Sequence, residues 1–301
     1  MVMHLDEAAI RRVLHWDPLI AAMEAALTAF SQGRVLQPVR EMLTIEEGRR
    51  YLGIMPAVAE DAMGLKLVSF YPGNADSSLP THMAMVLLFR TATGEPLAVM
   101  DGRLITEMRT AAVSAAATKH LAAPDAHVLA ILGSGVQAEA HLAALRRVRP
   151  IDEVRVWSRT QEHAERFAAA HGARAMAAER AVRGADIIVT ATSAVAPILE
   201  GAWLKPGAHV NAVGAPRPTW RELDDAAMAN ILVADSREAV LKESGDVILS
   251  GAAIHAEIGE IFGGTASVPV GATTVFKSVG LAVEDIAAAR LVYDALTAGE
   301  T

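Results

Sequence analysis

Residues 128–138 read VLAILGSGVQA and give the clearest indication of the architecture. The first five residues are apolar and predict a buried strand, and Gly133-Ser134-Gly135-Val136-Gln137-Ala138 matches G-x-G-x-x-A at the start of a predicted helix. In this context the first glycine makes a tight turn, the second lets a pyrophosphate approach the backbone, and a small third residue permits close helix–strand packing. The pattern predicts a dinucleotide site at the positive end of this helix.

The end of the next predicted strand, residues 154–158, indicates which dinucleotide is bound. A site for NAD usually has an acid about 20 residues after the glycines, where it binds the ribose hydroxyls. This chain has Trp157-Ser158-Arg159-Thr160 at that point instead. Because a guanidinium and two hydroxyls suit a 2′-phosphate, Ser158, Arg159 and Thr160 favour NADP(H). The alternative is that Arg159 is only a solvated surface charge.

From residue 127 the sequence alternates between strand and helix patterns. Strands are expected at 128–132, 154–158, 186–191, 209–213 and 231–235, with helices at 136–148 and 161–171. This alternation implies a parallel sheet with helices on its faces. Upstream, the β-like runs 39–45, 51–58, 64–71 and 83–90 have no helices between them, so an antiparallel sheet is expected.

Two long helices are expected around the antiparallel sheet. Asp17 and Pro18 are predicted as the N-cap and first residue of a helix that Gly33 closes, and residues 103–121 as an alanine-rich helix. The last predicted helix, residues 281–296, is expected to return to the first domain. The predicted fold class is therefore α/β, with a Rossmann dinucleotide-binding domain over residues 121–274 and an α+β domain built from residues 1–120 and 275–301.

Composition excludes several classes of function. The chain has 301 residues, 52% of them hydrophobic and 21% charged, which suits two globular domains. Its net charge of −8 argues against a nucleic-acid-binding protein. It has no cysteine for disulfides or thiolate metal sites, and its histidines show no metal-ligand spacing. With no signal-peptide pattern and no apolar run near ~18 residues, a cytoplasmic protein without a membrane or metal partner is expected.

Many stretches of the chain resemble one known family. They are residues 97–102, 105–106, 109–112, 133–138, 154–160, 205–209, 220–225, 241–246 and 273–278. The chain resembles the ornithine cyclodeaminase/mu-crystallin family, most closely its mu-crystallin members, over nearly everything from residue 63 onward. The resemblance implies a substrate-binding and dimerisation domain made from both chain ends, a Rossmann domain between them, and a homodimer.

The resemblance also implies a substrate pocket. Residues that match Arg40, Lys66 and Arg109 gather around the substrate's α-carboxylate in the family, and Thr81 matches a hydroxyl residue of the same pocket. Taken alone, Lys66 on an alternating strand is more typical of a solvated outer face. His82 follows Thr81 and would point away from it on a strand; both a general acid and a structural histidine fit it.

Further residues are expected to bind the cofactor. The family resemblance implies that the regions of Lys242 and Ser278 border the nicotinamide end of the cofactor. Lys242 also fits a lysine on the surface of a helix. Ala191, Thr192 and Val213 complete the expected cofactor site.

One loop departs from the cyclodeaminase pattern. Cyclodeaminases and related alanine dehydrogenases have an aspartate two residues after the glycine of loop 213–218, for acid–base chemistry at the substrate nitrogen, and this chain has Pro216 there. Because proline cannot exchange protons, the loop disfavours deamination, and mu-crystallin members also lack the acid. Asp224 and Asp225, nearby, are expected to begin a helix rather than to form a catalytic carboxylate pair.

The activity that the resemblance implies is NADPH-dependent reduction of cyclic imines that carry a carboxylate, such as Δ1-piperideine-2-carboxylate and Δ1-pyrroline-2-carboxylate. Arg40 and Arg109 would hold the carboxylate, and Lys66 would donate a proton to the imine nitrogen, with His82 or a water behind it. An amino-acid dehydrogenase or cyclodeaminase, and a non-catalytic protein that binds NADPH and a small ligand, are the alternatives.

Overall fold

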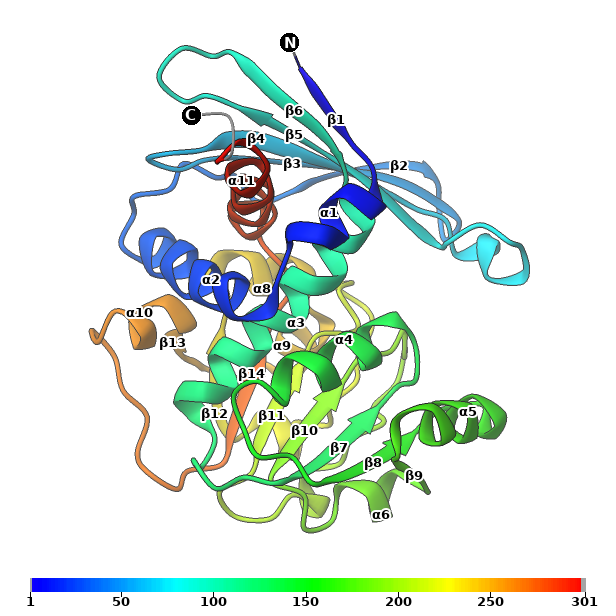
Figure 1. Cartoon of the computed structure of the whole chain (residues 1–301). Coiled ribbons are helices and arrows are strands. Elements are labelled where there is room, and N and C mark those ends of the chain that lie inside the picture. Colours follow the sequence, from blue (N-terminus) through cyan, green and yellow to red (C-terminus); the bar gives the residue numbers. More distant parts are fainter. Residues whose placement is uncertain (1, 299–301) are drawn as a thin grey trace. The chain divides into compact units, whose positions relative to one another are not determined.

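A computed structural model describes residues 2–298 of the chain (Figure 1). The chain divides into two compact units, one formed by residues up to Arg109 together with those from Leu281, the other by Thr110–Gly280. The first boundary falls within the long helix α3 (Gly102–Leu121), and the second lies just before helix α11 (Ala282–Thr297). The first unit therefore combines both ends of the chain.

The first unit is built on a six-stranded sheet in the order β1-β6-β5-β4-β3-β2. Strands β2 to β6 pair antiparallel, as the consecutive β-like runs predict, and β1 adds a parallel edge against β6. The runs that predict β2 to β5 lie close to the observed strands, whereas β1 and β6 were not predicted. The bounds are β1 Met3–Leu5, β2 Glu41–Glu46, β3 Arg50–Val58, β4 Met63–Phe70, β5 His82–Phe89 and β6 Pro96–Asp101.

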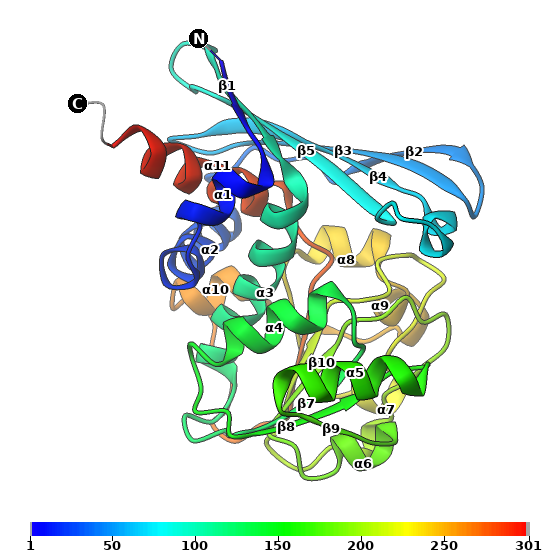
Figure 2. The ribbon, with the colours of Figure 1, turned by 45° about the vertical axis from the view of Figure 1, so that its right-hand side comes forward.

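Helices α1 (Glu7–Val13), α2 (Trp16–Ser31) and α11 lie on one face of this sheet (Figure 1, Figure 2). Helix α11 packs against β3, β4, β5 and α2. It approaches β4 so closely that a Cβ on Gly64 would lie 2.7 Å from Cδ1 of Ile286. Helix α11 therefore lies directly against the beginning of β4.

The start of α2 corrects the sequence prediction. The N-cap is His15, and Asp17 and Pro18 lie inside the first turn rather than at the N-cap and first position. Proline is tolerated there because the first backbone N–H groups of a helix have no intrahelical acceptor. Gly33 follows the helix with a φ of 71°, a left-handed conformation that suits glycine at a helix end.

The second unit is built on an eight-stranded parallel sheet in the order β13-β12-β14-β11-β10-β7-β8-β9. The sheet extends from β7 through β8 and β9 on one side and through β10 and β11 on the other. The strand order therefore reverses at β7, which is the Rossmann arrangement. The structure thus confirms the predicted α/β class. The strands are β7 Val128–Leu132, β8 Glu153–Trp157, β9 Arg174–Ala175, β10 Ile187–Thr190, β11 His209–Ala212, β12 Ile231–Ala234, β13 Ile254–Glu257 and β14 Thr274–Lys277.

Short helices cover this sheet. They are α4 Val136–Leu145, α5 Gln161–His171, α6 Ala178–Val182, α7 Asp225–Met228, α8 Arg237–Glu243, α9 Gly245–Ser250 and α10 Ile258–Phe262, with 3-10 turns at Pro72–Asp76 in the first unit and Gly201–Trp203 here. Asp224 caps α7 by accepting from the N–H of Ala227, as predicted. Among residues 2–298, no helix has the length and hydrophobicity that a bilayer crossing requires.

Candidate active site

Lys66 lies in the middle of β4 on the helix-covered face of the sheet. Its neighbours Leu65 and Leu67 point to the other face, so alternation places the ammonium inward. The side chain is 2% exposed, which excludes a solvated outer-face lysine. Its Nζ lies 2.7 Å from Oδ2 of Asp285 on α11 and 3.5 Å from Oγ1 of Thr106 on α3.

Arg109, on α3, shares this acid. Its Nε donates to Oδ1 of Asp285 at 3.0 Å, and its Nη1 donates to Oε2 of Glu284 at 2.5 Å. Arg109 is 4% exposed, and both acids are fully buried. The result is a buried cluster of two cations and two carboxylates, which we call the α11 charge cluster: Lys66, Arg109, Glu284 and Asp285.

The acids of the α11 charge cluster were not identified from the sequence. Both lie in the first turn of α11, where the helix dipole favours negative charge. Two adjacent carboxylates in an otherwise largely apolar helix are the signal that could have found them, because buried acids are rare unless they are paired. Pairing each carboxylate with a cation makes their burial possible.

The electrostatics of the cluster lower the pKa of Lys66 to about 8. Burial is the largest cause, because it penalises the charged ammonium. The carboxylate of Asp285 raises the pKa, and the positive charges of Arg109 and Arg40 lower it further. Lys66 therefore exchanges protons nearer to neutral pH than an ordinary lysine.

The structure places the other three predicted pocket residues at different distances from Lys66. Arg40 is half-buried just before β2, close enough for its charge to act on Lys66. Thr81 precedes β5 and His82 is its first residue; His82 is opposite Phe70 on β4, and Lys66 is opposite Val86. Four positions along β5, about 13 Å of backbone, separate His82 from the residue opposite Lys66, and a role for His82 in proton transfer stays a prediction.

Thr81 and His82 also correct a prediction about their orientation. The Oγ1 of Thr81 lies 3.2 Å from Nδ1 of His82, so the two side chains meet. They do not point apart because Thr81 precedes the strand, and alternation does not apply to it. The imidazole of His82 stacks on Phe70, with ring centroids 4.3 Å apart.

In the second unit, the glycine loop after β7 has the geometry that a pyrophosphate requires. Gly133 has a φ of 128°, and a Cβ there would lie 2.6 Å from the carbonyl oxygen of Ala191. Gly135 is the N-cap of α4, has nothing within 4 Å of the position of a Cβ, and makes no side-chain cap bond. The space beside Gly135 at the N-terminus of α4 therefore lets a phosphate approach the backbone.

The end of β8 holds the residues predicted to select NADP(H). Ser134 in the glycine loop donates through Oγ to Oγ of Ser158 at 3.0 Å, which joins this segment to the loop. Arg159 and Thr160 are exposed, and Thr160 is the N-cap of α5. A guanidinium and hydroxyls thus lie beside the dinucleotide loop at the position where NAD-binding sites usually have an acid.

Three further predicted cofactor residues are engaged with protein groups. Thr192 donates through its backbone N–H and its hydroxyl to Glu222, at 2.6 and 2.7 Å. Ser278 donates through its hydroxyl to Asp235 at 2.9 Å. Lys242 pairs with Glu238 on the surface of α8. Their roles in cofactor binding stay predictions, as do those of Ala191, Val136, Gln137 and Val213, which lie at the strand ends and in the glycine loop.

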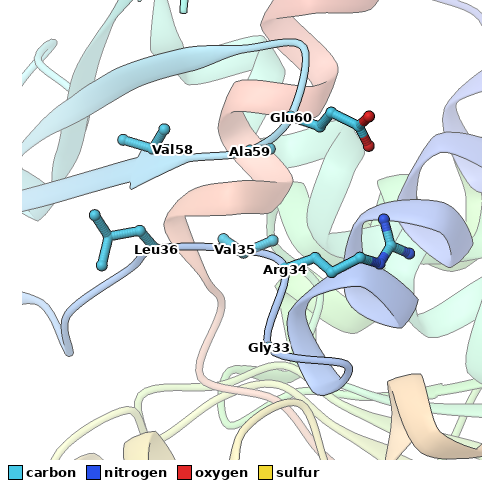
Figure 3. A pocket seen from close by; sticks show the side chains of 7 residues that line it. All are labelled: Gly33, Arg34, Val35, Leu36, Val58, Ala59 and Glu60. Carbon is cyan, nitrogen blue, oxygen red and sulfur yellow. The ribbon is translucent and has the colours of Figure 1, made fainter.

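A cavity of about 320 Å³ lies elsewhere in the first unit, between the turn after α2 and the end of β3 (Figure 3). It is lined by Gly33, Arg34, Val35, Leu36, Val58, Ala59 and Glu60, none of which belongs to the α11 charge cluster. Figure 3 shows Arg34 and Glu60 on one side and Leu36 and Val58 on the other. Within residues 2–298, no group of three or more His, Asp or Glu side chains could hold a metal ion.

Comparisons with known proteins identify the family of the chain. A family model described as the ornithine cyclodeaminase/mu-crystallin family matches residues 2–300. The ketimine reductase mu-crystallin of Rattus norvegicus is 53% identical over 94% of this chain and 93% of its own length.

Two solved structures are similar over the whole chain. The Δ1-pyrroline-2-carboxylate reductase of Thermococcus litoralis, in complex with NADH and L-proline, has a TM-score of 0.94 at 35% identity and covers 100% of this chain and 99% of its own. An archaeal alanine dehydrogenase dimer with bound NAD has a TM-score of 0.93 at 32% identity and covers 100% and 97%.

Proposed function

Because the chain belongs to the ornithine cyclodeaminase/mu-crystallin family, we propose that it is an NADPH-dependent reductase of cyclic imines that carry a carboxylate. Δ1-Piperideine-2-carboxylate and Δ1-pyrroline-2-carboxylate are the first substrates to test. The observation that carries the proposal is the α11 charge cluster, in which Lys66 and Arg109 share the carboxylate of Asp285. The relatives named as a ketimine reductase and a pyrroline-2-carboxylate reductase support the same reaction class.

Arg109 and Arg40 are proposed to bind the substrate carboxylate. Nε and Nη1 of Arg109 already donate to Asp285 and Glu284, so a substrate carboxylate would use Nη2. The half-buried Arg40 adds a second positive charge whose effect reaches Lys66. Two guanidinium groups on one carboxylate restrict its orientation and thereby orient the imine carbon.

Lys66 is proposed to protonate the imine nitrogen. With a pKa of about 8, it carries its proton at neutral pH and releases that proton more readily than an ordinary lysine. An imine carbon accepts hydride well only when its nitrogen is protonated. After the transfer Lys66 is neutral, and Asp285 keeps its hydrogen bond from Nε of Arg109, so no buried carboxylate loses all its partners.

The second unit is proposed to bind NADPH, which supplies the hydride. The N-terminus of α4 and the two glycines before it, with free space beside Gly135, fit the pyrophosphate. Ser158, Arg159 and Thr160 are the residues proposed to select the 2′-phosphate, because the end of β8 offers donors and a positive charge rather than a carboxylate.

A homodimer is the proposed assembly, and the helix-free face of the first unit's sheet is its proposed interface. Register places an apolar cluster there, bordered by Glu41, Ser69 and Asp101, and formed by Leu43, Leu52, Ile54, Leu65, Leu67, Met85, Leu87 and Val99. Met85 is 50% exposed and Leu43 43%, an unusual amount of apolar surface for one sheet face. The dimeric alanine dehydrogenase relative supports a second copy as the partner.

The test is NADPH oxidation, followed by absorbance, with each of the two cyclic imines and with NADH in parallel. We expect turnover that favours NADPH, and a loss of about a hundredfold or more in kcat for Lys66→Met. Lys119→Met, at an exposed lysine near the end of α3, is the matched control and should keep wild-type turnover. Failure of the wild-type protein to reduce either imine would refute the proposal; ammonia-dependent turnover of 2-oxo acids would instead indicate an amino-acid dehydrogenase.

A further inference from the structure

Glu222 is a fully buried carboxylate that joins the ends of two strands in the second unit. It accepts from Oγ1 of Thr190 at 2.7 Å, from N and Oγ1 of Thr192 at 2.6 and 2.7 Å, and from N of Gly214 at 2.9 Å. Thr190 ends β10, and Gly214 follows β11. One side chain therefore ties the loop after β10 to the loop after β11.

Asp246 and Lys277 fix Glu222 in turn. Oδ1 of Asp246 accepts from the backbone N–H groups of Glu222 and Leu223, at 2.8 and 2.9 Å. Nζ of Lys277, the last residue of β14, contacts Oδ2 of Asp246 at 2.8 Å and donates to the carbonyl oxygen of Gly214 at 2.6 Å. Gly214 is thus held through both its N–H and its carbonyl, and all three charged side chains are fully buried.

Close packing leaves no room for a side chain at two glycines of this network. A Cβ on Gly214 would lie 2.3 Å from Oε1 of Glu222 and 2.3 Å from the carbonyl oxygen of Thr192. A Cβ on Gly245 would lie 2.2 Å from the carbonyl oxygen of Trp220. The backbone of these loops therefore passes so close to the network that glycine is required at both positions.

The network lies at the ends of β10, β11 and β14, on the opposite side of β7 from the strand β8 that is predicted to border the adenosine half of the cofactor. The glycine loop follows β7 and the Ser158–Arg159 segment follows β8, so the adenosine half of a dinucleotide belongs over these strands. A dinucleotide crosses the carboxyl ends of the strands at the point where the strand order reverses, so its nicotinamide half belongs over β10 and β11 on the other side of β7. Glu222 binds the loops that begin at those two strand ends.

We propose that Glu222 is a positioning residue for the nicotinamide half of the cofactor site, and that Asp246 and Lys277 hold it in place. This inference rests on the proposed function only in taking NADPH as the cofactor. Glu222 does not touch the reacting atoms: the four hydrogen bonds that its carboxylate accepts come from the last residue of β10 and from the loops after β10 and β11, which would border the nicotinamide. Burial raises the pKa of Glu222, and the charge of Lys277 and the hydrogen bonds from Thr192 and Thr190 oppose that rise.

The test compares two ligands that differ in the nicotinamide half. Glu222→Gln puts an amide NH₂ against groups that are themselves donors, so the loops lose their fixed geometry. By calorimetric titration we expect the Kd of NADPH to rise about tenfold, the cost of leaving buried donors without an acceptor. The Kd of 2′,5′-ADP, which has no nicotinamide, should stay within about twofold of the wild-type value.

Thr190→Val provides a second variant in case Glu222→Gln folds poorly. It removes one donor to Glu222 while keeping the shape of the buried side chain. It should raise the Kd of NADPH several-fold and leave the Kd of 2′,5′-ADP unchanged. Thr274→Val is the matched control, because it removes a buried hydrogen bond to His209 at the first residues of β14 and β11, at the opposite end of the strands. It should leave both affinities unchanged.

Either of two results would overturn the inference: unchanged affinity for NADPH in both Glu222→Gln and Thr190→Val, or an equal loss of affinity for NADPH and 2′,5′-ADP, which would assign Glu222 to general stability of the unit. Failure of the proposed reaction is a separate result. A wild-type protein that binds both ligands but reduces neither imine would refute the activity while the two affinities still decide the role of Glu222.

Discussion

Nζ of Lys66 and Oδ2 of Asp285 lie 2.7 Å apart, and both side chains are excluded from solvent. This ion pair links the middle of a strand to the first turn of the last helix, and Arg109 binds the other oxygen of the same carboxylate. Asp285 therefore affects both proposed tasks of the site, since it raises the pKa of the proposed proton donor and orients the proposed carboxylate anchor.

Asp285→Asn should move the basic limb of the pH–rate profile to lower pH. The proposed reaction needs protonated Lys66, so kcat/KM falls as pH rises through its pKa of about 8. The carboxylate of Asp285 raises that pKa, and its removal lowers it, so the variant loses activity at a pH where the wild type is still active. The measurement is kcat/KM against pH for both proteins.

Glu284→Gln is the control for this shift, because Glu284 pairs with Arg109 rather than with Lys66. Its basic limb should move less than that of Asp285→Asn. An identical basic limb in wild type and Asp285→Asn would contradict the assignment of Lys66 as the proton donor. Titration of the substrate itself affects all three proteins equally and cancels in the comparison.

Lys66→Met should destabilise the protein, and Asp285→Asn added to it should restore stability but not turnover. The single variant leaves a buried carboxylate oxygen without its ammonium, which costs about 3–5 kcal/mol when one partner of a buried pair is removed. The double variant removes that charge as well. Urea denaturation measures the first effect and NADPH oxidation the second; recovery of turnover in the double variant would show that Lys66 has no chemical role.

Acid should destabilise the second unit through two buried histidines. Burial lowers the pKa of His141 to about 4 and of His209 to about 3, against 6.5 in an unfolded chain. Below pH 6.5 the unfolded state binds protons that the folded state does not, so stability falls as pH falls, by up to about 1.4 kcal/mol per pH unit for each histidine. At still lower pH, near the folded pKa values, this loss levels off.

His209→Gln isolates that effect from the titration of carboxylates. The variant should show a smaller loss of unfolding free energy between pH 6.5 and 4 than the wild type, whatever its absolute stability. His163→Gln, on the exposed surface of α5, should keep the wild-type pH dependence. Equal slopes in wild type and His209→Gln would show that His209 is protonated in the folded protein over this range.

The sequence predicted those helices and strands whose own residues show a periodic pattern or a motif. Alternating side chains predicted strands close to β3, β4 and β5, because one face of each is buried and the period of two survives in the sequence. The glycine loop predicted β7 and α4 because a dinucleotide turn requires particular residues at fixed spacing. The three-residue strand β1 is too short to show a period and was missed.

The candidate site followed less well from the sequence. Residue type and family resemblance pointed to Lys66 and Arg109, but not to the acids that bind them. Arg109 and Asp285 are 176 residues apart, and no local pattern records which buried acid meets which buried cation. Glu222 is a similar case, since its partners Thr190, Thr192 and Gly214 lie at separate strand ends that only the folded sheet brings together.

Arg159→Ala should reduce the preference for NADPH. The side chain is exposed at the end of β8, beside the segment that Ser134 and Ser158 join to the glycine loop. Loss of a charge-assisted bond to a 2′-phosphate corresponds to about 10- to 100-fold in kcat/KM for NADPH, with little change for NADH. Arg166→Ala, an exposed arginine on α5, is the control. Equal changes with both cofactors would exclude Arg159 from recognition of the 2′-phosphate.

Met85→Lys should convert the proposed dimer into a monomer. Met85 is 50% exposed in the middle of the helix-free sheet face, between Leu67 and Asp101, so a pair of sheets packed there would bury one new ammonium group from each copy in a largely apolar cluster. Sedimentation analysis should find dimeric wild type and monomeric variant. Leu249→Lys, at a similarly exposed leucine in the second unit, should stay dimeric and show that added charge alone does not separate the copies. A dimer that persists in Met85→Lys places the interface on another surface, because a lysine in a close-packed apolar interface cannot be accommodated without loss of affinity.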